Sequence, residues 1–173
     1  MIIKTRREKF GGIVFFEKPG FVGYVNSAMA DAIGIKKNRN AHYIDAVFAS
    51  PLDAHFAVTT RCNMYCKGCY NTIKSDANVD IDLNKAKRII DNLAALFVLS
   101  VSFGGGEPTL YPDIIELAEY ERSKNILPNM TTNGLTIDAE FTKKCRVFGN
   151  VHFSIHKPAD METLAKRLQD GET

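Results

Sequence analysis

Residues 58–70 read VTTRCNMYCKGCY and hold three of the four cysteines of this 173-residue chain. These are Cys62, Cys66 and Cys69, at the spacing C-x3-C-x2-C. The run from His55 to Thr59, just before them, predicts a short strand. Cysteines crowded into one loop indicate metal ligands or redox thiols, because a secreted disulfide framework usually spreads its cysteines and pairs them.

Thiolates are soft ligands that favour iron–sulfur clusters, zinc or copper(I). Three of them on one loop can hold three corners of a cubane and leave a fourth iron open to a small molecule, whereas electron-transfer clusters usually have four cysteines. The spacing therefore favours an iron–sulfur cluster that performs chemistry. The alternative is a zinc site in which a histidine, such as His42 or His55, completes the three cysteines.

Beyond the cysteine loop, strand-like and helix-like patterns alternate along the chain. Strands are predicted at 55–59, 98–103, 127–131 and 151–155, and helices at 83–97, 112–123, 138–145 and 158–169. This alternation predicts an α/β fold with a parallel sheet and right-handed crossovers. Sites in parallel sheets lie at the carboxyl ends of the strands, so we expect the cysteine loop to meet Gly104–Pro108, Thr132–Gly134 and the residues after Ser154 there.

Three of these segments together resemble the signature of the radical S-adenosylmethionine (radical SAM) superfamily. T-x-R-C-N-x-x-C-x-x-C-Y follows the first strand, Gly105-Gly106-Glu107-Pro108 follows the next strand and resembles the GGEP motif, and Thr132-Asn133-Gly134 follows the third strand and resembles the TNG segment. The resemblance implies a partial (β/α) barrel. It also implies that the three cysteines ligate a [4Fe-4S] cluster, whose fourth iron is chelated by the methionine end of SAM. One electron from the reduced cluster would cleave SAM to a 5′-deoxyadenosyl radical, which takes a hydrogen atom from a substrate.

The resemblance assigns contacts to the methionine end of SAM. Gly105, Gly106 and Glu107 would surround the methionine ammonium, because backbone without side chains allows a close approach to a strand end. Thr132 and Asn133 would shape the same pocket. The alternative is a local role for the glycines, which would only form a tight turn between strand and helix.

The adenosine end of SAM has fewer candidates. Many family members carry an aromatic residue beside the adenine, just before the third cysteine, where this chain has Gly68. Tyr65 or Tyr70 would then supply a ring; the alternative is that both are packing residues. Ser154, on the fourth predicted strand, would contact the ribose.

Residues 1–49 predict a small module ahead of the α/β part at 50–173. Strands are predicted at 10–16 and 21–25, with a short helix from Asn26 or Ser27 to Ile33 that Gly34 ends, and 43–49 is predicted as a further short strand or an extended segment. The pattern loosely resembles the first half of PqqD-like winged-helix modules, which bind precursor peptides by adding a strand. We favour the alternative that the hairpin packs beneath or beside the barrel as structural cover.

Such modules occur on radical SAM proteins that modify peptides or mature cofactors. The N-terminus is also similar to those of SPASM-type maturases, including maturases associated with tungsten-cofactor oxidoreductases. The resemblance therefore implies a precursor peptide or protein as substrate and an electron donor as partner. A charged run in this module is interpreted as a solvated edge, and its members are Lys4, Arg6, Arg7 and Lys9.

Composition narrows the setting. The net charge is +2 with acids and bases mixed, which gives no argument for a nucleic-acid or membrane partner. No apolar run approaches the roughly 18 residues that span a bilayer, and the N-terminus lacks the apolar core of a secretory signal, so we expect a cytoplasmic protein. Cys145 is interpreted as a small buried hydrophobe, and His152 and His156 as structural residues.

Radical SAM cores have six βα units, of which four are predicted here. We therefore expect a fragment, a truncated gene product, or half of a split assembly in which another chain supplies the missing strands. An uncovered last strand leaves the isolated chain poorly stable or in need of a partner. Two other functions stay open: a zinc-binding structural module, and a non-catalytic remnant that binds a peptide or partner through residues 1–49.

Overall fold

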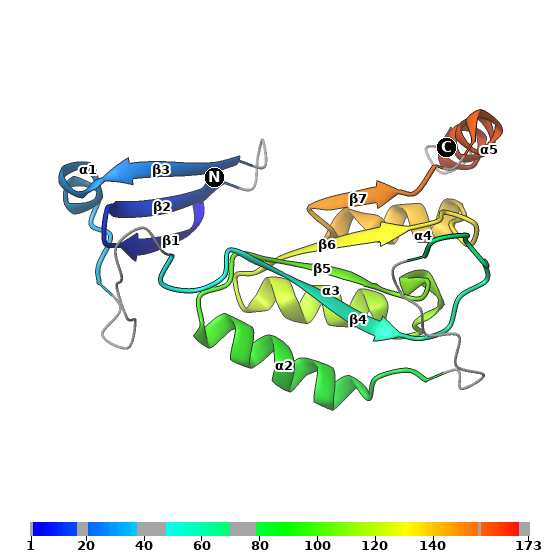
Figure 1. The fold of residues 1–173 in the computed structure, drawn as a ribbon, viewed down its shortest axis with the longest axis horizontal. Helices are drawn as coiled ribbons and strands as arrows, with labels where there is room; N and C mark the ends of the chain where they lie inside the picture. Colours follow the sequence, from blue (N-terminus) through cyan, green and yellow to red (C-terminus); the bar gives the residue numbers. More distant parts are fainter. Residues whose placement is uncertain (1, 17–20, 38–47, 70–78, 156, 170–173) are drawn as a thin grey trace.

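The structure, a computed structural model, describes residues 2–16, 21–37, 48–69, 79–155 and 157–169. They form an antiparallel sheet in the order β1-β2-β3 and a parallel sheet in the order β4-β5-β6-β7. The antiparallel sheet lies at one end of the long axis of the molecule (Figure 1). The predicted α/β fold with a parallel sheet is confirmed.

The parallel part alternates strand and helix four times, as predicted. Its strands are β4 (Asp53–Thr59), β5 (Ser100–Gly105), β6 (Leu127–Thr132) and β7 (Asn150–Phe153). The helices that follow are α2 (Leu83–Ala95), α3 (Ile114–Ser123), α4 (Ala139–Lys144) and α5 (Pro158–Gln169), and the 3-10 turns are η1 (Pro108–Leu110) and η2 (Cys145–Val147).

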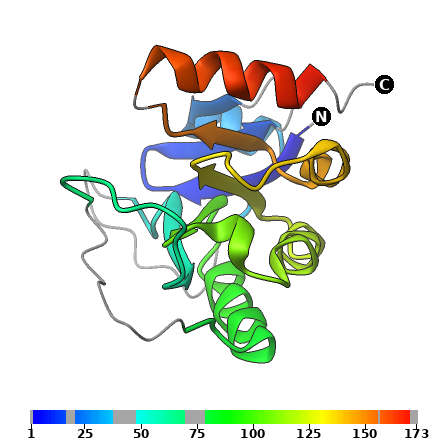
Figure 2. The ribbon, with the colours of Figure 1, turned by 90° about the vertical axis from the view of Figure 1, so that its right-hand side faces the viewer.

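The main core lies between the sheet and its helices. Helix α2 starts at Asp82, whose Oδ1 accepts the Lys85 N–H at 2.9 Å as an N-cap. Its buried residues Ala86 and Ile90 then pack against strand residues such as Val101. Figure 2, a view turned by 90°, shows helices α2 to α5 following one side of the curved sheet.

The other face of the sheet is polar. His55, Ser102 and Asn129 are register partners on β4, β5 and β6, and Thr131 and His152 are partners on β6 and β7. Of these, His55, Thr131 and His152 are exposed. A parallel sheet covered on both faces consists of almost continuous apolar runs, whereas strands that alternate apolar and polar residues have one wet face. The sheet therefore presents a polar inner surface, like that of an open barrel.

The N-terminal module consists of β1 (Ile2–Glu8), β2 (Gly11–Phe16), β3 (Phe21–Asn26) and α1 (Ser27–Ala32). Strands β2 and β3 confirm the predicted hairpin, and the Oδ1 of Asn26 caps α1 by accepting the Met29 N–H at 2.9 Å. Strand β1 was not predicted. Most of the expected strand at 43–49 lies outside the described residues.

The module packs beneath the parallel sheet. Ile13 and Phe15 on one face of β2 share an apolar cluster with Leu99 and Leu127, which lie at the amino ends of β5 and β6. On the other face, Val14 packs with residues of α1 and the segment after it. The module thus closes the end of the sheet opposite to the strands' carboxyl ends, which agrees with a structural cover.

The interpretation of the charged run as a solvated edge is wrong for both arginines. Arg6 is 4% exposed, and its Nε donates to Glu8 Oε1 at 2.6 Å, while its Nη1 donates to Ser50 Oγ at 2.7 Å and Pro51 O at 2.9 Å. On a strand, residues two apart share a face, so Arg6 and Glu8 are buried as a pair. The sequence alone showed only a charged run.

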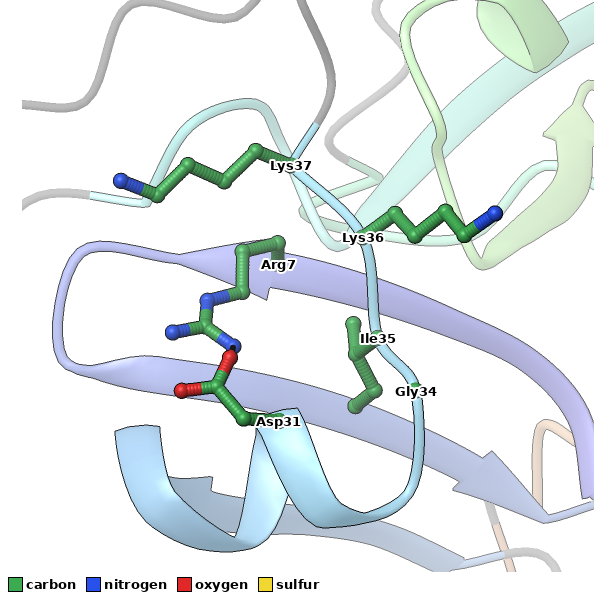
Figure 3. Close-up of a pocket in the computed structure, with 6 residues that line it drawn as sticks. All are labelled: Arg7, Asp31, Gly34, Ile35, Lys36 and Lys37. Carbon is green, nitrogen blue, oxygen red and sulfur yellow. Dashed lines mark hydrogen bonds and ion pairs between the residues drawn. The ribbon is translucent and has the colours of Figure 1, made fainter.

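Arg7 lies on the opposite face of β1 and is 8% exposed. Its Nη1 donates to Asp31 Oδ1 at 2.6 Å, which joins β1 to α1. Figure 3 shows the two side chains beside a surface pocket of about 410 Å³, around which Lys36 and Lys37 point in opposite directions. Both lysines are exposed, so the buried arginine pairs with the helix and the lysines remain at the rim.

Among the described residues, no helix has the length and apolar character needed to cross a membrane.

Candidate functional site

Three loops meet at the carboxyl ends of the parallel strands. The cysteine loop follows β4, the GGEP loop follows β5 and the TNG segment follows β6. Figure 1 shows the loop after β4 at the end of the sheet far from the module. The sequence predicted from topology alone that these three loops lie together.

The two ends of the cysteine loop are joined at its base. Thr60 N donates to Val79 O at 2.8 Å, and Val79 N donates back to Thr60 Oγ1 at 2.8 Å. Arg61 forms a two-pronged pair with Asp80, Nε to Oδ1 at 3.0 Å and Nη2 to Oδ2 at 2.6 Å, and also donates to Leu110 O. Bidentate pairs of this kind are directional as well as strong. The loop therefore leaves the sheet and returns to it at one place.

The glycines of the GGEP loop allow main chain to pack on main chain. Gly106 N donates to Thr59 O at 2.8 Å, and Glu107 N donates to Arg61 O at 2.7 Å. A Cβ on Gly106 would lie 2.0 Å from Arg61 O, and Gly105 has φ +110°, which side chains rarely adopt. These contacts give both glycines a structural role in packing the GGEP loop against the cysteine loop.

The Glu107 carboxylate is used inside the protein. It is 2% exposed. Its Oε1 accepts from Thr109 N at 3.2 Å, Thr109 Oγ1 at 2.6 Å and Thr132 Oγ1 at 2.6 Å, and its Oε2 accepts from Asn133 N at 2.8 Å. Both oxygens thus join the GGEP loop to the TNG segment, and the Glu107 side chain links these two motifs.

The TNG segment also contacts the cysteine loop. Asn133 Nδ2 donates to Asn63 Oδ1 at 2.7 Å, across 70 positions of sequence, and Leu135 N donates to Asn133 Oδ1 at 2.9 Å. Side chains therefore connect all three motifs.

The cysteines of the loop are accessible thiols. Cys62 and Cys69 are exposed and Cys66 is half-buried, and among the described residues, which include all four cysteines, no disulfide forms. Cys69 N donates to Cys66 O at 3.3 Å, so these two lie on one turn. Three accessible soft donors on one loop fit a cubane, in which each thiolate binds a different iron.

A zinc site would need a histidine close to the three cysteines. A single ion needs its ligands gathered around one point, and no three Cys, His, Asp or Glu side chains of the described residues are gathered in this way. His55 lies within β4, four residues before the strand ends, and His42 lies outside the described residues.

The remaining predicted residues differ in their exposure and in their distance along the chain from the three motifs. Tyr65 is 96% exposed and so is not a packing residue, while Tyr70 lies outside the described residues. Ser154 comes directly after β7, and its N–H donates to Thr132 O at 2.8 Å, which brings it beside the TNG segment. Cys145 is half-buried against the main core, and burial raises the pKa of its thiol to about 11, as suits a small hydrophobe.

Sequence reasoning missed three contributors to this site. Arg61 and Asn63 stand inside the cysteine segment, and their polar character beside Cys62 was the available signal. Asp80 had none, because its role depends on the chain returning to the end of β4 after 19 residues.

Comparisons with known proteins agree with this geometry. The family model described as the radical SAM superfamily matches residues 56–170. The chain is 35% identical over 110 residues to Fe-coproporphyrin III synthase of Methanosarcina barkeri, covering 63% of this chain and 28% of that protein. It is 29% identical over 122 residues to PqqA peptide cyclase of Bradyrhizobium diazoefficiens, covering 70% and 32%. The chain thus spans about a third of the length of these curated relatives.

Solved structures share the fold. Streptococcus suis SuiB superposes with a TM-score of 0.69 at 18% identity, over 98% of this chain and 52% of that one. Its form bound to the precursor peptide SuiA gives 0.64 at 17% identity, over 96% and 53%. The coverage extends over both sheets of the present chain. The family match covers well over half of the residues, and this chain therefore belongs to the radical SAM superfamily.

Proposed function

We propose that this protein is a radical SAM enzyme in which Cys62, Cys66 and Cys69 hold a [4Fe-4S] cluster and the neighbouring strand ends hold SAM. When bound, the cluster would supply one electron for reductive cleavage of SAM to a 5′-deoxyadenosyl radical. The observation that carries the proposal is the direct hydrogen bonding among the cysteine loop, the GGEP loop and the TNG segment. Motifs that are far apart in sequence are thus joined in one hydrogen-bonded network.

The residues of the chain would position both groups. The exposed thiols of Cys62 and Cys69 and the half-buried thiol of Cys66 offer three soft ligands. The methionine end of SAM would lie against the main chain of Gly105 and Gly106. Their carbonyl oxygens, together with the lone pair that Glu107 Oε2 keeps beside its hydrogen bond from Asn133 N, would be the acceptors for the ammonium.

The adenosine end of SAM would lie farther along the same edge. Ser154 lies beside Thr132, where it can face the ribose, and Thr132 and Asn133 would shape the pocket. Tyr65 is exposed enough to move over an adenine ring. The substrate would then bind at the polar inner face of the sheet, which suits a polar molecule.

We infer that the substrate is a peptide or protein. The names of two relatives refer to peptides, PqqA peptide cyclase and SuiB bound to a precursor peptide, and the likeness to SuiB includes the N-terminal module. The module would bind part of the substrate by strand addition at an edge of β1–β3. Its place beneath the sheet means that a bound peptide must run along the molecule to reach the cysteine loop.

A second candidate is maturation of a cofactor. The relative with 35% identity is named for a porphyrin product, Fe-coproporphyrin III. Maturation linked to tungsten-cofactor oxidoreductases belongs to the same class. In either case the protein would need an electron donor and a reducing compartment, for which we propose the cytoplasm. Another part of the protein, or another chain, would continue the sheet beyond β7.

Anaerobic reconstitution with iron and sulfide, followed by electron paramagnetic resonance (EPR) of the reduced protein, tests the proposal. We expect a [4Fe-4S]⁺ signal that changes shape when SAM is added. A cluster signal indifferent to SAM would favour a remnant that binds a partner through residues 1–49. One zinc per chain without acid-labile sulfide would contradict the proposal.

A further inference from the structure

Four residues close a ring of hydrogen bonds around the mouth of the site. Glu107 N donates to Arg61 O at 2.7 Å, Asn133 N donates to Glu107 Oε2 at 2.8 Å, and Asn133 Nδ2 donates to Asn63 Oδ1 at 2.7 Å. The main chain from Arg61 to Asn63 completes the ring and contains Cys62. Of these links, only the one between Asn63 and Asn133 is made by two side chains.

The orientation of the Asn133 amide follows from its partners. Its Oδ1 accepts the N–H of Leu135 at 2.9 Å, so its Nδ2 must be the atom that faces Asn63. The atom of Asn63 that meets it must then be an acceptor, Oδ1. Both ends of the Asn133 side chain are therefore engaged within the protein, one with its own turn and one with the cysteine loop.

We propose that Asn63 is a positioning residue, which acts through Asn133 to set the place of Cys62 relative to the SAM-binding strand ends. The inference rests on the proposed function and assigns it a residue that neither binds iron nor needs to contact SAM. Arg61 and Asp80 hold the base of the loop, and the Asn63–Asn133 bridge fixes the loop to the TNG segment on the other side of Cys62.

The contact suits a positioning role better than a stabilising one. It is exposed, so water can replace either partner, and its loss should lower the midpoint of thermal unfolding by only a few degrees, which is still measurable. Its geometric effect is larger, since it is adjacent in sequence to Cys62 and joins that residue to a loop that Glu107 anchors in the core. Loss of the bridge should leave the fold and the three thiol ligands intact while Cys62 shifts relative to SAM.

Four variants of the whole protein separate the possibilities. Asn63→Ala and Asn133→Ala each remove the bridge. Asn63→Asp keeps an acceptor at the same place, whereas Asn133→Asp replaces the donor by an acceptor and abolishes the bridge. The two aspartate variants each add one negative charge at nearly the same point, so each is the control for the charge of the other. The readouts are iron per chain, the SAM concentration that gives half of the EPR change, and thermal unfolding of the metal-free protein.

With Asn63→Ala and Asn133→Asp we expect normal iron content and an increase of about fivefold to tenfold in the half-saturating SAM concentration. Asn63→Asp should stay within about twofold of the parent protein, because its bridge is kept. In metal-free protein, the two alanine variants should be non-additive when combined, which shows that the residues are coupled.

A parent-like SAM response in Asn63→Ala would overturn the inference. If Asn133→Asp is impaired beside it, Asn133 acts on SAM without Asn63. If the parent protein itself shows no response to SAM, the proposed function is wrong and the positioning role is wrong with it. Coupling between the two asparagines in metal-free protein would distinguish that case from an absent bridge.

Discussion

The two ends of the parallel sheet are built by opposite means. At the amino ends of the strands, the module closes the sheet with an apolar cluster and a buried Arg6–Glu8 pair, 4% and 1% exposed. At the carboxyl ends, exposed or half-buried thiols stand on a loop that is held by backbone contacts and by the Arg61–Asp80 pair. One end is therefore closed by buried groups that need each other, and the other offers groups that suit a ligand.

This difference predicts which changes affect stability and which affect binding. A buried charge depends on its partner, because water cannot replace it. An exposed ligand can be removed with little effect on folding, because water solvates what remains. Substitutions at the module should therefore lower the free energy of unfolding and leave metal binding by the folded protein unaltered, while substitutions at the loop should do the reverse.

The largest effect should come from the cysteine loop. Replacing Cys62, Cys66 and Cys69 together by alanine should abolish iron incorporation while the midpoint of thermal unfolding of the metal-free protein changes by no more than a few degrees. Iron and sulfide analysis after anaerobic reconstitution measures this. Cys145→Ala is the matched control and should keep its iron, since its thiol is part of the core. Iron retained by the triple variant would place the cluster elsewhere.

The next effect should come from the closed end. Arg6→Ala should lower the free energy of unfolding by about 3–5 kcal/mol, because Glu8 would be left as a buried unpaired charge. Denaturant titration measures it, and Arg146→Ala, at an exposed position, should change it by less than about 0.5 kcal/mol. The double variant Arg6→Met/Glu8→Leu should recover most of the loss. Equal losses in the single and double variants would show that the pair itself is not the cause.

Glu107 is a buried acidic residue, like Glu8, but it lies at the carboxyl ends of the strands beside the cysteine loop. Glu107→Gln keeps one acceptor oxygen but turns an NH₂ group toward the donors that the carboxylate satisfies. We expect a loss of about 2 kcal/mol in the free energy of unfolding, together with weaker SAM binding. The exposed Glu119→Gln on α3 controls for loss of charge. A change below about 0.5 kcal/mol would mean that the link between the motifs is not formed in solution.

Glu121 on α3 is the contrasting buried acid. Neither of its carboxyl oxygens has a hydrogen-bond partner in the structure, and burial raises its pKa from 4.5 to about 9, although the main chain of Val101 nearby and Arg122 favour the charged form. The folded protein thus keeps a proton that the unfolded chain releases above pH 4.5. The free energy of unfolding should therefore fall as pH rises from 4.5 to about 9.

Glu121→Gln should remove this dependence, which amounts to roughly 2–4 kcal/mol between pH 5 and pH 8. Denaturant titrations at several pH values compare the variant with the parent protein and with Glu119→Gln, which should behave like the parent. A parent protein whose stability is flat across this window would mean that the carboxyl reaches water or a partner when folded.

The sequence by itself determined the order of the strands and helices and the three motifs at the carboxyl ends of the strands. Apolar periodicity located the four βα units, because burial on one side of a helix or strand repeats with a fixed period. The sequence also identified the candidate metal ligands Cys62, Cys66 and Cys69, because cysteines at such short spacing have few other uses. The predicted parallel topology placed the cysteine, GGEP and TNG segments at one edge of the sheet.

Only the tertiary structure decided how charged and polar side chains are used. The sequence predicted a solvated edge at Arg6 and Arg7, yet both arginines are buried, Arg6 with the buried Glu8 and Arg7 against the exposed Asp31. Glu107 is predicted to contact the ammonium of SAM, and the structure adds that its carboxylate links two motifs. The reason is physical: apolar burial follows a local pattern, whereas the partner of a charge or an amide is set by where distant segments meet, and no local period records that.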